Sequence, residues 1–146
     1  KGGLGLISSR LMIEGPIIKK KASFLVAARR SYADIFLPLA PKEEMRNNTL
    51  YFYDLNFKVN AEINEKNRVF ASGYFGNDVF GVNNSNGGNF GMNYGNNTLT
   101  FRWNHLFNPK LFSNFTLLRS DYNYQLGSDN PNQNFTWDSR MTNYSF

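Results

Sequence analysis

The sequence lacks several features on which common protein classes depend. It contains no cysteine, so it has neither a disulfide framework nor a thiolate metal site. No stretch approaches the roughly 18 to 20 apolar residues that a membrane-spanning helix needs. No signal peptide opens the chain, which begins with Lys1, Gly2 and Gly3. We therefore expect the chain to be a fragment of a longer protein, with any targeting segment upstream.

The chain also has only a small excess of basic over acidic residues. The formal net charge is +5, and the basic residues are spread along the chain apart from Lys19, Lys20 and Lys21, which we interpret as a solvated turn. Nucleic-acid binding is therefore not expected. The one histidine, His105, has no second imidazole to share a metal ion, so we expect a structural or interfacial role for it.

Aromatic residues and asparagine, by contrast, are abundant. Phe, Tyr and Trp make up 16% of the chain, and Asn occurs 22 times. Hydrophobic residues reach 41%, yet the mean hydropathy is −0.48, which is unusual for a typical soluble core. Aromatic residues interleaved with small polar ones suit pleated strands that have two different faces.

The clearest pattern is a strict alternation over residues 51–63. The odd positions are aromatic or aliphatic, whereas the even positions from Asp54 onward are polar or charged. A period of two places all the apolar side chains on one face of a β-strand. A length of 13 residues exceeds the roughly 5 or 6 of an average soluble strand and fits better the roughly 9 to 11 that a barrel strand needs to cross a bilayer.

Similar segments recur along the chain. The predicted strands are residues 10–17, 22–36, 51–63, 68–80, 98–107, 111–126 and 135–146. No segment has a convincing helical period. In residues 68–80 and 111–126 apolar residues occur at both parities, for which a β-bulge is one explanation, and the register of these two segments stays open.

The predicted connections alternate in length. Tight turns are expected near Lys19, Glu65 and Pro109, and longer polar loops over residues 37–50, 81–97 and 127–134. Residues 81–97 are mostly Gly and Asn and are expected to be mobile. Short turns at one rim and long loops at the other are typical of outer-membrane barrels. The predicted fold class is therefore all-β, an antiparallel transmembrane β-barrel segment of about seven to eight strands.

A bilayer would explain the two faces. In lipid every backbone N–H and C=O group must be paired within the protein, which a closed sheet achieves. Charges buried in a dry core would cost several kcal/mol each, and a wet lumen removes that penalty. Residues expected to face the lumen, a ligand or a plug are Arg29, Arg30, Asp54, Asn56, Lys58, Asn60, Glu62, Arg102 and Asn104, although alternation lets only one of the two adjacent arginines point inward. Residues expected to face lipid are Tyr53, Leu55, Phe57, Val59, Ala61, Leu99, Phe101 and Trp103.

Aromatic residues near the ends of the predicted strands suit the interfacial girdles of such barrels. They are Tyr51, Tyr53, Phe107, Tyr122, Tyr124 and Trp137.

No constellation of residues supports an enzyme. Nothing pairs the acidic residues as a general acid and base. Ser8 and Ser9 lack a nucleophile elbow, and residues 2–5 are too incomplete for a phosphate-binding loop. We therefore expect no catalytic residue, no metal and no cofactor.

Several segments, taken in order, carry a resemblance to a known family. They are GLISSRL at residues 5–11, EGPI at 14–17, ARRSY at 28–32, YDLN at 53–56, SGYFG at 72–76 with Asp78, and RWNHLF at 102–107. In this combination the chain resembles the early barrel strands of TonB-dependent outer-membrane receptors of Bacteroidetes type, including those with an N-terminal carboxypeptidase-regulatory-like domain.

The resemblance implies a 22-stranded barrel closed by a plug. It also implies uptake of scarce nutrients such as iron chelates, cobalamin or glycans, with energy from the TonB complex. Residues 1–146 would be a partial barrel domain without the plug and the remaining strands. The implied partners are outer-membrane lipid, the protein's own plug, the TonB complex, in many such receptors a surface lipoprotein, and the outer-membrane assembly machinery, whose signal the terminal Phe146 resembles. The implied location is the bacterial outer membrane.

Other functions stay open from the residues alone. One is a passive porin or structural outer-membrane barrel, which an upstream plug sequence would exclude. Another is a soluble, aromatic-rich carbohydrate-binding β-sandwich, which would not depend on detergent. The sequence specifies neither the transported substrate, nor a lipoprotein partner, nor the oligomeric state.

Overall fold

The computed structural model of the chain describes residues 1–84, 88–131 and 133–146. Its strands are β1 (Gly2–Leu4), β2 (Ser8–Ile18), β3 (Ala22–Ser31), β4 (Thr49–Asn64), β5 (Asn67–Asn84), β6 (Gly88–Asn108), β7 (Leu111–Asn130) and β8 (Gln133–Ser145). A 3-10 helix, η1 (Ala33–Leu39), and a four-residue helix, α1 (Glu43–Arg46), connect β3 to β4.

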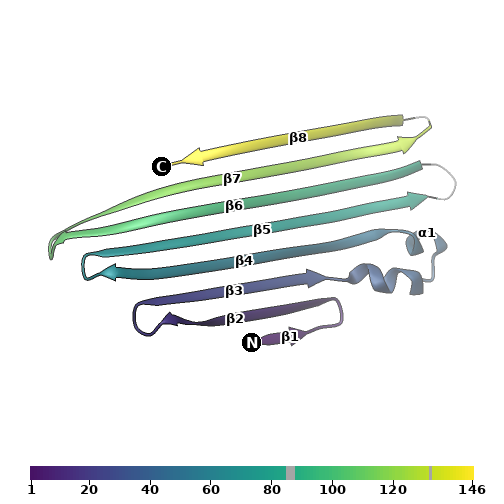
Figure 1. Cartoon of the computed structure of the whole chain (residues 1–146). Helices are drawn as coiled ribbons and strands as arrows, with labels where there is room; N and C mark the ends of the chain where they lie inside the picture. Colours follow the sequence, from purple (N-terminus) through teal and green to yellow (C-terminus); the bar gives the residue numbers. More distant parts are fainter. Residues whose placement is uncertain (85–87, 132) are drawn as a thin grey trace.

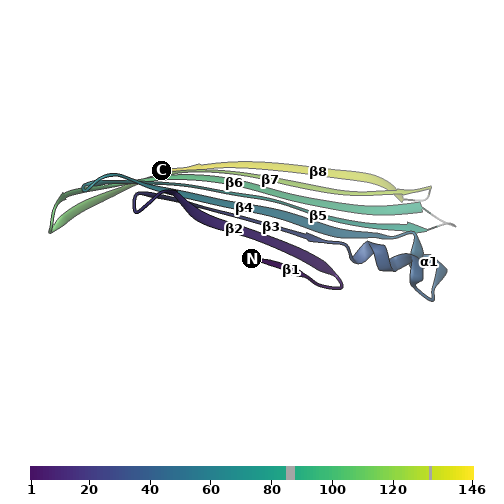
Figure 2. The same cartoon turned by 60° about the horizontal axis from the view of Figure 1, so that its bottom comes forward.

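All eight strands form one antiparallel sheet in which the spatial order follows the chain order from β1 to β8. The strands lie in a single twisted layer, and the N- and C-termini lie at opposite edges of it (Figures 1 and 2). The sheet is not closed, because β1 and β8 do not pair with each other. We call the end that carries η1 and α1 the helix end, and the end with the β2–β3, β4–β5 and β6–β7 turns the turn end (Figure 1).

A single layer leaves this chain without a hydrophobic core. Among the described residues no hydrophobic side chain is buried, and the exposed surface is 10989 Å². A compact monomer of this mass exposes roughly 7,600 Å². The backbone ladder, rather than side-chain packing between layers, therefore holds the strands together.

The three tight turns form where the sequence predicts them. In the β4–β5 turn the Asn64 side-chain oxygen accepts hydrogen bonds from the Lys66 backbone N–H at 3.0 Å and from the Asn67 amide at 2.8 Å. The Asn108 side chain accepts one from the Lys110 N–H at 2.9 Å in the β6–β7 turn. Such Asx turns are the reason why asparagine is favoured at these positions.

Two of the predicted long loops are wrong. Strand β5 continues to Asn84 and β6 begins at Gly88, so the Gly- and Asn-rich segment is paired as strands wherever the structure describes it; residues 85–87 lie outside the described residues. Likewise β7 runs to Asn130 and β8 begins at Gln133. Pairing with neighbours overrides the low strand propensity of Gly and Asn here.

The predicted strand over residues 22–36 ends early, at Ser31. Residues beyond it form η1, which contains Pro38, and then α1, neither of which the sequence predicted. Both helices are shorter than the span over which a helical period can be recognised.

The proposed β-bulge within residues 68–80 or 111–126 is also wrong. The register of β4 with β5, and of β6 with β7, shifts only beside the turns, after Glu62 and after Leu106. Apolar residues occur at both parities because both faces of these strands carry apolar side chains.

We predict that Gly73→Val in β5 destabilises the fold, whereas Gly91→Val in β6 does not. A side chain at Gly73 would overlap the ring of Phe57 and lie 3.0 Å from Leu99, but one at Gly91 would meet nothing within 4 Å. Overpacking of this kind costs about 1–3 kcal/mol. Denaturant unfolding followed by tryptophan fluorescence measures both variants. Equal stability of the two would contradict the packing described.

Candidate functional site

The sheet has two chemically different faces. Side chains alternate between the faces along each strand, and directly paired residues of adjacent strands share a face. The apolar face is defined by Tyr53, Leu55, Phe57, Val59 and Ala61 of β4, and the polar face by Asp54, Asn56, Lys58, Asn60 and Glu62 of the same strand.

The strand register extends the apolar face into a continuous belt. The apolar belt consists of Leu11, Ile13, Phe24, Val26, Ala28, Leu55, Phe57, Val59, Ala61, Val69, Ala71, Phe75, Leu99, Phe101, Trp103, Phe115 and Leu117. Toward the helix end the first polar residues on this face are Arg30 in β3, Asn77 in β5, Asn97 in β6 and Arg119 in β7. The belt therefore occupies the part of the sheet nearer the turn end.

A cluster around Asn67 marks the turn-end border of the belt. The Asn67 side-chain oxygen accepts a hydrogen bond from Trp103 Nε1 at 3.0 Å and lies 2.7 Å from His105 Nδ1. The His105 ring packs edge-on against Phe107, with centroids 4.5 Å apart. His105 is thus a packed and hydrogen-bonded residue on the apolar face. Side chains of this kind, with an apolar body and a polar tip, are suited to an interface between apolar and aqueous surroundings.

The strongest polar contact on the polar face joins Arg29 of β3 to Asp54 of β4. The Arg29 Nε and Nη2 atoms each lie 2.7 Å from Asp54 Oδ2. Asn56 donates to the other carboxylate oxygen at 3.5 Å, and the guanidinium lies 4.8 Å from the Phe52 ring centroid. Asp54 is 9% exposed, and no other charged residue is buried among those the structure describes. The Arg29 side chain shields the carboxylate from water on this face.

Further polar contacts continue along the same face. Arg68 Nη2 lies 3.1 Å from Glu62 Oε2, and the Asn60 amide donates to Ser23 Oγ at 2.8 Å. The side chains of Asn104 and Asn114 are hydrogen-bonded at 2.8 Å. Lys58 and Arg102 are exposed on this face. The polar face is therefore wet and charged opposite the apolar belt.

Toward the helix end the polar face changes character and becomes aromatic. The register brings rings from β5 to β8 onto it, including Tyr74 and Phe135. We call six of them the aromatic patch: Phe80, Phe90, Tyr94, Tyr122, Tyr124 and Trp137. Tyr94 and Tyr122 pack edge-on at 4.8 Å, and Phe80 and Phe90 at 6.5 Å. The prediction that Tyr122, Tyr124 and Trp137 belong to the same interfacial girdles as Tyr51 and Tyr53 is wrong, because the register places these two groups of residues on opposite faces of the sheet.

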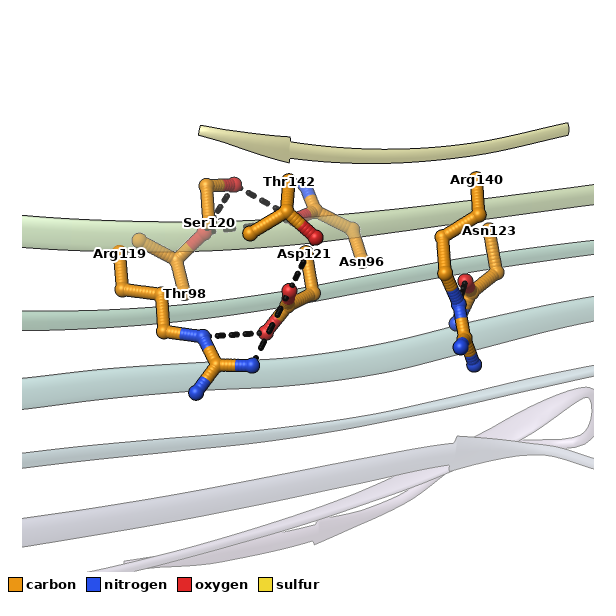
Figure 3. A network of polar contacts seen from close by, with 8 residues as sticks. All are labelled: Asn96, Thr98, Arg119, Ser120, Asp121, Asn123, Arg140 and Thr142. Carbon is orange, nitrogen blue, oxygen red and sulfur yellow. Dashed lines mark hydrogen bonds and ion pairs between the residues drawn. The ribbon is translucent and has the colours of Figure 1, made fainter. Parts of the chain in front are cut away.

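On the apolar face beyond the belt, a polar network joins β7 and β8 (Figure 3). Arg119 Nε lies 2.9 Å from Asp121 Oδ2, and Thr142 Oγ1 donates to Asp121 Oδ1 at 2.8 Å. Arg140 Nε donates to the Asn123 side chain at 3.0 Å. The hydrogen bonds from Thr142 and Arg119 lower the pKa of the Asp121 carboxyl, so this network is charged at neutral pH.

The structure groups most of the sequence-predicted residues as expected by alternation. Arg29, Arg102 and Asn104 share the polar face with the even positions of β4, and Leu99, Phe101 and Trp103 share the apolar face with the odd positions. Arg30 is the exception in the first set. It pairs with Tyr53 on the apolar face, and its guanidinium lies 5.9 Å from the Tyr51 ring centroid.

The described residues contain no group of three or more His, Cys, Asp or Glu side chains placed to hold a metal ion. Within the same part of the chain, no helix has the length and apolar character needed to cross a membrane.

Comparison with known proteins gave no match to a protein-family model, a curated protein or a solved structure.

We predict that Asp54→Ala destabilises the protein more than Glu62→Ala. The Asp54 side chain is 10% exposed and that of Glu62 35%. Removing a shielded carboxylate beside a half-exposed arginine is expected to cost about 1–2 kcal/mol, whereas an exposed pair contributes roughly 0–1 kcal/mol. Denaturant midpoints of the two variants measure the difference. A larger effect at Glu62 would show that Arg29 and Asp54 do not form the stronger contact.

Proposed function

We propose that the chain forms part of the wall of a bacterial outer-membrane β-barrel that takes up nutrients in a TonB-dependent manner. The observation that carries the proposal is the apolar belt on one face of a single-layer antiparallel meander whose other face is charged. A soluble sandwich would cover its apolar face with a second sheet, and the described residues form one sheet only.

The height of the belt supports a bilayer setting. In β4 the apolar side chains of this face, which are the belt residues together with the flanking Tyr53 and Ile63, run from Tyr53 to Ile63, the last apolar residue before the turn. Ten residue steps span about 33 Å along a strand, which corresponds to about 25 Å of height at a tilt of about 40°. The outward apolar band of outer-membrane barrels is about 25 Å tall.

The stagger of the turns supports the same tilt. Ala22, Ala61, Val69 and Trp103 lie in one row across the sheet. Strands β2 and β3 turn just beyond Ala22, whereas β6 continues five residues past Trp103 to Asn108. Ile18 of β2 pairs with Ala22, so the row extends from β2 to β6, which lie four strand spacings of about 4.8 Å apart. Over that distance the turn end shifts by about 17 Å along the strands, which corresponds to a tilt of about 40°. Barrel closure requires strands tilted by about 35–45°, and the stepped turns are visible in Figure 1.

The open edges and the polar face fit the wall of a larger barrel. Strands β1 and β8 each present an unpaired backbone edge, and unpaired groups in hydrocarbon cost several kcal/mol each. We infer that further strands of the same barrel pair with both edges. Residues such as Lys58 and Arg102 would then line a water-filled lumen, where their charges need no burial.

The energy-coupled character of the uptake rests on the resemblance of the sequence segments to TonB-dependent receptors. It implies a plug, the TonB complex, the outer-membrane assembly machinery and, in many such receptors, a surface lipoprotein as partners. The plug would meet the polar face, whose shielded Arg29–Asp54 pair offers a rigid contact point. We expect no enzymatic activity.

We predict that single cysteines along β4 alternate in environment with a period of two. The chain has no native cysteine, so each labelled site is unique. In lipid vesicles, fluorophores at positions 55, 57 and 59 should be quenched by spin-labelled lipid, and those at 56, 58 and 60 by aqueous iodide. Protection of both sets from lipid would refute a membrane-facing belt.

We further predict that uptake by the full-length protein stops when the proton gradient is collapsed. An uncoupler should abolish accumulation of the nutrient in cells, whereas outer-membrane insertion, measured by surface proteolysis, should not change. Uptake that persists at the same rate without the gradient would identify a passive porin instead.

A further inference from the structure

Four tyrosines lie close together on the polar face toward the helix end. We call them the tyrosine cluster: Tyr74 of β5, Tyr94 of β6, and Tyr122 and Tyr124 of β7. Each of these strands pairs with a neighbour on both sides, so the cluster lies inside the sheet and not at its edges. All four side chains are half-buried, and part of each ring is therefore open to a ligand.

Gly76 determines how the Tyr74 ring lies. The two residues are successive on the polar face of β5, and a side chain at Gly76 would overlap the Tyr74 hydroxyl and lie 2.8 Å from its Cζ atom. The Tyr74 ring therefore leans along the strand over the glycine backbone, beside Asn96, which is paired with Gly76. Glycine within a strand often marks such a close approach. A leaning ring presents its face, rather than its edge, to a ligand above the sheet.

Polar side chains lie among the rings. Asn96 is paired with Tyr122, and Thr98 and Ser120 form the next row on the same face. The Thr98 hydroxyl donates to Asn96 Oδ1 at 3.3 Å and lies 3.1 Å from the Ser120 hydroxyl (Figure 3). The Asn96 amide nitrogen donates no hydrogen bond within the part of the chain that the structure describes, so its donors remain for a ligand.

The charges around the cluster favour a neutral ligand. The tyrosine cluster occupies three successive rows of paired residues, and in β4 to β7 the only charged residues of these rows on the polar face are Asp54 and Asp78. Arg29 neutralises Asp54, whereas Asp78 is exposed beside Tyr94. An anionic iron chelate would therefore meet a carboxylate here and no unpaired cation.

We propose that the tyrosine cluster binds a neutral oligosaccharide, with sugar C–H faces stacked on the rings and hydroxyl groups hydrogen-bonded to Asn96 and Asp78. A pyranose ring combines an apolar face with a polar rim, and the cluster offers partners for both. The three rows extend over about 14 Å along the strands, which is longer than one sugar ring and fits a short chain of them.

This inference deepens the proposed uptake function and rests on it for the placement of the polar face in the lumen. The helix end carries the longest connection, and in outer-membrane barrels the longer loops are extracellular. The cluster would then lie in the outer half of the lumen, where an incoming nutrient first meets the wall.

The test measures ligand binding by the full-length protein in detergent. An array of short neutral and acidic oligosaccharides identifies the neutral ligand that binds most tightly, and titration calorimetry then gives its affinity, with ferric citrate as the anionic comparison. We expect a neutral oligosaccharide to bind and ferric citrate not to bind. Y94L/Y122L should bind the oligosaccharide about tenfold more weakly, a loss comparable to that of an aromatic platform beneath a stacked base.

Two further variants separate the position of a ring from general effects of substitution. G76A keeps all four tyrosines but displaces the Tyr74 ring, and it should weaken binding about threefold, because one aromatic contact loses its geometry. Y53L removes a tyrosine from the opposite face of β4 at a similar height, so it is the matched control and should bind like the unaltered protein. Variants are compared only after unboiled gel migration shows that they are folded.

Each outcome has a defined meaning. Binding of no neutral oligosaccharide, unchanged binding by Y94L/Y122L or by G76A, or an equal loss in Y53L would overturn the inference. Binding of ferric citrate that is lost in Y94L/Y122L would assign the cluster to an anionic ligand and would also overturn it. Failure of the unaltered protein to insert into lipid vesicles would reject the proposed barrel wall, whereas insertion without oligosaccharide binding would reject the role of the cluster alone.

Discussion

The backbone ladder between antiparallel strands is the constraint on which every other feature of this chain depends. Seven successive pairings fix the register from β1 to β8, and the register alone decides which side chains share a face. No second layer and no buried hydrophobic side chain supports the ladder among the described residues. Because a large exposed apolar face is unfavourable in water, the apolar belt needs a cover. Under the membrane proposal, hydrocarbon covers the belt and the other face stays wet.

The sequence predicts the parts of the fold in which local chemistry and the ladder agree. Strict alternation in residues 51–63 identifies β4 and both of its faces, and Asx-type turns identify the turn end. Where the two disagree, prediction fails. Gly91 and Asn93 read as loop residues, yet they pair with neighbours on both sides, because a hairpin already fixed at its turn end extends strand pairing through weak formers. The prediction for the residues beyond Ser31 fails for another reason, because η1 and α1 are too short to show a helical period.

The contacts of the candidate site also fall into those that the local sequence can predict and those that depend on the strand register. Arg29 and Asp54 are 25 residues apart in sequence, and only the β3–β4 register brings them together, so no local pattern could link them. Arg119 and Asp121, by contrast, lie two residues apart on one face of one strand, and alternation could have predicted their contact. The aromatic patch was missed because its rings come from four strands, and in β7 they appear only as a loss of clean alternation at Tyr122 and Tyr124.

That loss of alternation has a physical meaning along the strand axis. Strands of 16 to 21 residues in β4 to β7 exceed the roughly 9 to 11 needed to cross a bilayer. Under the membrane proposal, one face must be apolar within the belt and the other can be charged. Beyond the belt both faces would meet water, so the apolar face can carry Arg119 and Arg140 there, and the polar face can carry Tyr94 and Trp137. The alternation of apolar and polar residues therefore breaks down, under the membrane proposal, at the level at which the hydrocarbon ends. That level can be located in the sequence of each of these strands.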